Sequence, residues 1–103
     1  MASDFQIKFH REASEELERA KAWYEQQRAG LGEAFLHEVE SAISRIRDNP
    51  TTWPCYPGKD TQRYILHRFP FGIVYQRQSQ IIRVLAVMHL KREPGYWKRR
   101  AYE

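Results

Sequence analysis

The stretch QRYILHRFPFGIVYQRQSQIIRVLAVMH, which spans Gln62–His89, decides the fold of this chain. β-Branched and aromatic residues dominate three runs in it, and two short turn sequences, PFG at 70–72 and QSQ at 78–80, separate these runs. Runs of this composition between turn residues are typical of consecutive strands joined by hairpins. The stretch therefore predicts an antiparallel meander of three strands over residues 62–69, 73–77 and 81–88.

The part of the chain before this stretch has the periodicity of one strand and two helices. Residues 5–9 alternate apolar and polar side chains, which predicts a short strand. Apolar residues then recur at helical spacing over 12–24 and 35–46, with Gly30 and Gly32 between the two segments. Two helices joined by so short a break form an antiparallel hairpin. The predicted fold is therefore α+β with the order β-α-α-β-β-β. Its helices cover one face of a sheet. The first strand either joins this sheet or stays unpaired.

Length and composition indicate one domain over residues 1–103 without a cofactor. The single cysteine, Cys55, excludes an internal disulfide framework and a cysteine-based zinc cluster. There is no signal-peptide pattern, and no apolar run approaches the ~20 residues of a membrane span, so a cytoplasmic protein without a membrane partner is expected. Glu33, His37 and Glu40 could share a helical face, but such a set arises often by chance, and no metal site is expected.

Charge is distributed unequally along the chain, whose net charge is +4. Residues 1–50 hold ten acidic against seven basic side chains, a net charge of −3, whereas residues 51–103 hold three against ten, a net charge of +7. A basic half attracts an anionic partner, which can be a nucleic-acid backbone or an acidic peptide. A merely solubilising surface is the alternative interpretation.

Arginines lie inside two of the predicted strands. Uninterrupted alternation would place Arg83 and His89 on one face of the last strand, and Arg63 beside Ile65 on a face of the strand after the loop. An arginine in a small sheet is costly unless it meets a carboxylate, a phosphate or water. Two interpretations are therefore open for Arg63 and Arg83: a structural ion pair or exposed face, and a phosphate clamp.

The end of the last strand carries residue types that RNA cleavage requires. That reaction removes a proton from the 2′-hydroxyl, stabilises a pentavalent phosphate and returns a proton to the leaving oxygen. His89 or Tyr96 could transfer the protons, and Arg92 and Arg63 could stabilise the phosphate. These four are the candidate catalytic residues.

Further basic and aromatic residues are candidate contacts for a nucleic acid. Tyr96 and Trp97 could stack on an unpaired base, or they could simply pack the end of the chain onto the core. The candidate nucleic-acid-binding residues are Lys59, Arg68, Arg83, Lys91, Trp97 and Lys98.

Nearly the whole chain resembles the RelE/ParE superfamily, the toxins of bacterial type II toxin–antitoxin modules, some of which take part in plasmid stabilization. The resemblance rests on the strand Arg63–Leu66, on Arg68–Tyr75 across the hairpin, on Ile82–His89, and on the basic ending Arg92–Trp97. It implies a helical hairpin packed on a small twisted antiparallel sheet, with the first strand beside the late ones. It also implies a cognate antitoxin that covers the basic groove in a toxin–antitoxin hetero-oligomer.

The resemblance leaves three functions open. RelE-like members cleave mRNA in the ribosomal A site without a metal, and Arg63, His89, Arg92 and Tyr96 match their basic and His or Tyr positions. On this interpretation the chain is a growth-inhibiting endoribonuclease whose partners are the ribosome and mRNA. ParE-like members instead poison DNA gyrase by binding it, without catalysis, and a third interpretation is a non-toxic relative that only binds.

Overall fold

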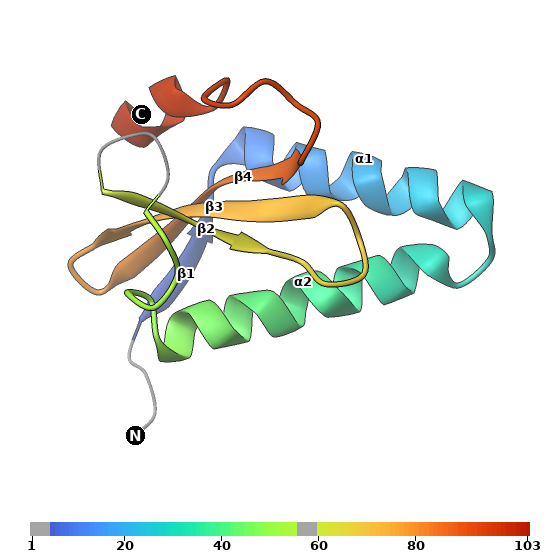
Figure 1. The fold of residues 1–103 in the computed structure, drawn as a ribbon, viewed down its shortest axis with the longest axis horizontal. Helices are drawn as coiled ribbons and strands as arrows, with labels where there is room; N and C mark the ends of the chain where they lie inside the picture. The colour runs from blue at the N-terminus through green and yellow to red at the C-terminus, as the bar shows by residue number, and fades with distance from the viewer. Residues whose placement is uncertain (1–4, 56–59) are drawn as a thin grey trace.

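The fold is seen in a computed structural model that describes residues 5–55 and 60–103. Its elements follow the predicted order, with a short 3₁₀ helix after the last strand (Figure 1). They are β1 (Gln6–Phe9), α1 (Arg11–Gln27), α2 (Leu31–Asp48), β2 (Thr61–Ile65), β3 (Phe71–Gln78), β4 (Ile81–His89) and η1 (Lys98–Tyr102). The predicted α+β class and the helical hairpin are confirmed.

The four strands form one mixed sheet in the order β1-β4-β3-β2. β2, β3 and β4 are the predicted antiparallel meander. β1 joins the sheet as predicted, but it runs parallel to β4, with Ile7 opposite Ile82. The helices lie between β1 and the rest of the sheet in sequence, and such a helical connection is what allows two strands to pair in parallel.

A β-bulge in β4 reverses the face on which its later side chains lie. Tyr75 pairs with Val84 and Val74 with Ala86, so Leu85 is an extra residue in β4. Before the bulge, Val84 faces the helices. After it, Ala86 packs on the opposite face. The uninterrupted alternation expected from the sequence is therefore wrong, and Arg83 and His89 lie on opposite faces of the sheet.

Both faces of the sheet are covered. On one face, α1 and α2 pack against the strands around an aromatic group in which Tyr24 and Phe35 contact Phe69 with ring centroids 4.8 and 5.1 Å apart. On the other face, residues 96–103, here called the tail segment, cover a second apolar cluster (Figure 1). The buried members of this second core are Val74, Leu85, Ala86, Met88, Trp97 and Ala101.

The helical hairpin is closed by local hydrogen bonds at its break. Gly30, the N-cap residue of α2, has a φ of 89°, a left-handed conformation that favours glycine. The carboxylate of Glu25 accepts the backbone N–H groups of Gly30 and Gly32 at 3.0 and 2.9 Å. These two hydrogen bonds lower the pKa of Glu25.

None of the described helices combines the length and the apolar character that crossing a membrane requires.

Candidate functional site

A cavity of about 510 Å³ lies between α1 and the end of β4. Ala20, Phe71 and Val87 contribute apolar surface to it, and Trp23, whose side chain is 56% exposed, lies at its margin. Three of its lining residues can carry positive charge: Arg19, His89 and Arg92. We call this feature the α1 cavity. Two of the four candidate catalytic residues, His89 and Arg92, therefore lie around one space.

His89 and Arg92 are oriented by contacts with neighbouring groups. The His89 ring meets the ring of Phe71 edge-on at 5.1 Å, and its Nδ1 accepts the backbone N–H of Lys91 at 3.1 Å. Since Nδ1 accepts a hydrogen bond, the proton of the neutral imidazole is on Nε2. The Arg92 guanidinium lies 3.7 Å from the centre of the Tyr96 ring. This cation–π contact holds Arg92 at the rim of the α1 cavity.

Tyr96 is held in a partly buried hydrogen bond that opposes its use in proton transfer. Its hydroxyl donates to a carboxylate oxygen of Glu16 at 2.8 Å. Burial, and then the hydrogen bond to Glu16, raise the pKa of Tyr96 well above its ordinary value. The phenol therefore stays protonated with its proton directed at Glu16, and its ring is covered by Arg92.

This raised pKa makes stability depend on alkaline pH. Above the ordinary tyrosine pKa of 10.0, the unfolded chain loses the Tyr96 proton while the folded chain keeps it. The free energy of unfolding then falls with rising pH, by up to about 1.4 kcal/mol per unit for such a group. Buried Tyr75 adds to the slope in the same way. We expect Tyr96→Phe to make the free energy of unfolding fall less steeply with pH, as measured by urea unfolding from about pH 9 to about pH 11. Tyr102→Phe, at a residue that is 77% exposed, should keep the slope of the unaltered protein, and an equal slope in both variants would contradict the assignment.

Arg63 lies on the opposite face of the sheet from His89. It pairs with Val74 on β3, and Val74 belongs to the second core, so Arg63 is on the tail-segment face of the sheet. His89 pairs with Phe71, which belongs to the core on the helix face. The sheet itself therefore lies between Arg63 and His89, and the four residues do not converge on one reacting atom.

The candidate nucleic-acid-binding residues are also dispersed. Lys91, Lys98 and Arg68 are exposed, and the Arg68 guanidinium lies 5.4 Å from the centre of the Phe69 ring. Trp97 is fully buried in the second core and has no exposed ring face for a base. Lys59 lies outside the described residues.

Arg83 has a structural role that the sequence left open. Its guanidinium donates to the backbone oxygens of residues 100, 101 and 103 at 3.3, 3.5 and 2.9 Å, and to the side chain of Gln76 at 3.1 Å. It therefore holds the tail segment against the sheet, and its partners among the described residues are these backbone oxygens and the Gln76 side chain.

A buried ion pair between Glu16 and Arg100 was not predicted from the sequence. The Arg100 guanidinium donates to both Glu16 carboxylate oxygens at 3.1 Å and to the backbone oxygen of Leu85 at 2.9 Å. Glu16 also accepts the backbone N–H of Val87 at 3.0 Å. β1 pairs with β4 only as far as Val84, so these contacts satisfy polar backbone groups of β4 beyond the end of β1.

One signal for Glu16 was present in the sequence. It lies three residues after Ala13 and four before Ala20, so it is a carboxylate inside the apolar stripe of α1. Arg100, one of three consecutive basic residues, offered no such signal.

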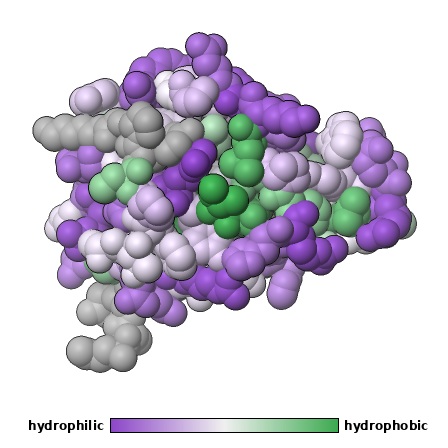
Figure 2. Space-filling view, viewed as in Figure 1, coloured by the Kyte–Doolittle hydropathy of each residue, from purple (hydrophilic) through white to green (hydrophobic). Residues whose placement is uncertain are grey.

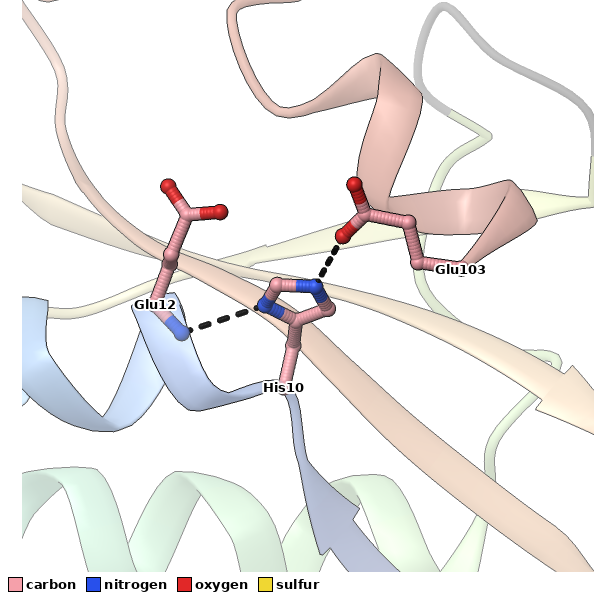
Figure 3. Close-up of side chains that lie close together, drawn as sticks. All are labelled: His10, Glu12 and Glu103. Carbon is pink, nitrogen blue, oxygen red and sulfur yellow. Dashed lines mark hydrogen bonds and ion pairs between the residues drawn. The ribbon is translucent and has the colours of Figure 1, made fainter.

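His10, Glu12 and Glu103 form a described cluster of metal-ligand type (Figure 3), with ligand atoms within 4.8 Å of one another. The chemistry of the donors opposes a metal. His10 Nδ1 accepts the backbone N–H of Glu12 at 3.1 Å, so the imidazole proton is on Nε2, which donates to Glu103. The Glu12 carboxylate already binds Arg99 at 3.0 Å. The cluster therefore caps α1 and ties the tail segment to it.

Comparisons with known proteins agree with this fold. A family model described as the ParE toxin of the type II toxin–antitoxin system parDE matches residues 7–94. A solved structure of the chromosomal ParDE TA system from P. aeruginosa is similar with a TM-score of 0.67 and 16% identity, over 82% of this chain and 95% of that chain. At this identity the likeness shows the fold alone. A search of curated proteins found no match. The family match covers most of the chain, and the chain therefore belongs to the ParE toxin family of type II toxin–antitoxin systems.

Proposed function

We propose that this toxin inhibits growth by binding a protein target, DNA gyrase, without catalysis of its own. The observation that carries the proposal is the separation of the candidate catalytic residues. Arg63 and His89 lie on opposite faces of the sheet, and the Tyr96 hydroxyl is bound to Glu16. A general acid or base must reach the proton that it transfers, and the arginines that stabilise the phosphate must lie beside the same reacting group. This separation supports a binding function over cleavage of RNA.

The α1 cavity supports a protein target. It combines apolar surface with the exposed aromatic ring of Trp23 and the guanidinium groups of Arg19 and Arg92. Tryptophan and arginine are enriched among the residues that contribute most to protein–protein binding. We propose that Trp23 and Arg92 are the main contacts with the target.

The cognate antitoxin is the second partner in this proposal. The family is defined by type II toxin–antitoxin systems, and the basic second half of the chain is complementary to an acidic antitoxin segment. We propose that the antitoxin forms a hetero-oligomer with the toxin and prevents it from reaching the target.

Induction of variants in growing cells tests the binding mechanism. We expect Trp23→Ala combined with Arg92→Glu to relieve growth arrest and to weaken binding to purified gyrase by at least about tenfold. Arg11→Ala removes a charge from an exposed position in α1 and should leave both unchanged. His89→Gln should also leave growth arrest intact, because no proton transfer is involved. Growth arrest that persists in the Trp23 and Arg92 double variant would contradict the assigned contacts.

Cleavage of mRNA on the ribosome is the second candidate, and one observation favours it: His89 and Arg92 line the same cavity. It predicts that His89→Gln abolishes growth arrest and that new mRNA 5′ ends appear after induction of the unaltered chain. Under the gyrase proposal, induction instead produces gyrase-dependent DNA breaks, and resistant gyrase alleles restore growth. Mapping of 5′ ends and of DNA breaks in the same cultures separates the two candidates.

A further inference from the structure

Four rings in contact with one another line the α1 cavity, and we call them the aromatic wall: Trp23, Tyr24, Phe71 and His89. Trp23 and Tyr24 meet edge-on with ring centroids 5.1 Å apart, and the centre of the Tyr24 ring lies 6.2 Å from that of Phe71. Phe71 in turn contacts the ring of His89 at 5.1 Å. Aromatic rings prefer offset-stacked or edge-to-face contacts with other rings. The wall therefore favours a planar aromatic group in the cavity.

The α1 cavity has the size and character of a site for a small molecule. Its volume of about 510 Å³ lies within the roughly 300–1,000 Å³ of such sites, which combine mostly apolar walls with a few polar groups. Ala20, Phe71 and Val87 form its apolar part, and each is at most 9% exposed. In Figure 2 hydrophilic residues predominate over α1, whose place Figure 1 gives, and apolar residues appear between them and the middle of the molecule.

The positive charge at the α1 cavity is not neutralised. Across residues 5–55 and 60–103, the guanidinium of Arg19 meets no carboxylate, and that of Arg92 contacts the ring of Tyr96 instead. The acidic lining residue is Glu16, whose two oxygens each accept a hydrogen bond from Arg100 at 3.1 Å. The cavity therefore has two arginines that can form charge-assisted hydrogen bonds with an anion.

We infer that the α1 cavity binds a small planar aromatic carboxylate. Arg19 and Trp23 lie four residues apart on α1 and so share one face of the helix. The ring of the ligand stacks against the aromatic wall, and its carboxylate accepts hydrogen bonds from the arginines. Ala20, Phe71 and Val87 supply no hydrogen-bonding side chain, so a hydrocarbon ring suits this part of the cavity better than a nucleobase does.

A regulatory consequence rests on the proposed function. Trp23 and Arg92 are the main contacts assigned to the target, and both line the cavity that the ligand fills. Two molecules cannot occupy the same space, so a bound aromatic carboxylate excludes the target from this surface. Small acids of this class would then relieve growth arrest without any antitoxin.

Matched probes test the class of ligand. We expect 2-naphthoate, titrated into the full chain by isothermal calorimetry, to bind with a dissociation constant of about 1 mM or lower. The uncharged 2-naphthamide has nearly the same shape and should bind at least about tenfold more weakly, the usual effect of losing one charge-assisted hydrogen bond. Backbone amide chemical shifts should change around Trp23 and residues 87–92 and not along β2. The inference is wrong if 2-naphthoate does not bind, if the two probes bind equally, or if adenosine monophosphate binds more tightly than 2-naphthoate.

Variants of the cavity separate charge from stacking. Arg19→Gln combined with Arg92→Gln should weaken binding of 2-naphthoate by at least about tenfold and leave binding of 2-naphthamide unchanged, which also shows that the variant is folded. Trp23→Ala should weaken binding of both probes. Arg11→Gln removes a charge from an exposed position of α1 outside the cavity and should change neither. Unchanged binding of 2-naphthoate to the double arginine variant would overturn the inference.

Competition with purified gyrase distinguishes this inference from the proposed function. At ten times its own dissociation constant, 2-naphthoate should raise the apparent dissociation constant for gyrase about tenfold. If the probe fills the cavity and gyrase binds as before, the target contacts and the regulatory consequence are both wrong, whereas the ligand site stands. If the chain does not bind gyrase at all, the proposed function fails, and the calorimetry alone decides the ligand site.

Discussion

Glu16→Ala is expected to lower the free energy of unfolding by about 3–5 kcal/mol, the usual cost of removing one partner from a buried ion pair. Glu16 and Arg100 are 7% and 4% exposed, so the remaining Arg100 charge has little access to water. The substitution also removes the acceptor for the Val87 N–H and for the Tyr96 hydroxyl. The measurement is urea unfolding followed by circular dichroism, with the slope of the transition checked for two-state behaviour.

A double-mutant cycle separates loss of the ion pair from loss of other contacts. Arg100→Met alone leaves the Glu16 carboxylate buried without its charged partner, and it should also be strongly destabilising. The two substitutions together should cost less than the sum of the single losses, because neither charge is then left unpaired. Glu15→Ala is the matched control, since its exposed carboxylate only approaches Arg11 at 3.9 Å, and it should change stability by less than about 0.5 kcal/mol. If the double variant lost as much stability as the sum of the two single variants, Glu16 and Arg100 would not be a coupled pair.

Trp97→Ala is expected to cost about 3–5 kcal/mol, because it removes a large and fully buried side chain from the second core. This core lies between the sheet and a short segment, and few side chains are available to fill the space. A domain of this size has a total stability of about 5–15 kcal/mol, so the variant should be partly unfolded at moderate temperature. The tail segment should then leave the sheet and expose Leu85 and Met88.

Two measurements check this result. Thermal unfolding should show a lower midpoint, and backbone amides of the tail segment should exchange with solvent faster than those of the helix-side core. Tyr102→Ala is the control, in the 3₁₀ helix that directly follows Trp97. Its side chain is 77% exposed, and it should leave both measurements nearly unchanged. If Trp97→Ala were as stable as Tyr102→Ala, the second core would not contribute to the fold.

These two predictions concern contacts that sequence reasoning did not reach. The element order was predictable because each element leaves a local signal. The two-residue period of 5–9, the helical spacing of the two following segments, and the turns at Pro70 and Ser79 each depend on neighbouring residues alone. The predicted hairpins and the helical hairpin are confirmed for that reason.

The candidate site was predicted only in part. The end of β4 was identified from its basic and aromatic residues, and His89 and Arg92 do line one cavity. The extra residue at Leu85 puts His89 on the face of the sheet opposite Arg83, because a one-residue insertion in a strand moves every later side chain to the other face. Nothing in the composition of 81–88 marks the bulge, since the side chains on both sides of it are apolar.

The order and type of the elements, the apolar stripes of the helices and the family resemblance could all be read from the sequence alone. The tertiary structure decided the parallel pairing of β1, the separation of Arg63 from His89, the burial of Trp97 and the pairing of Glu16 with Arg100. The physical reason is distance along the chain. Periodicity and turn chemistry act between residues a few positions apart. Glu16 and Arg100 are 84 residues apart, and only the completed sheet, with an unpaired edge to satisfy, brings them together.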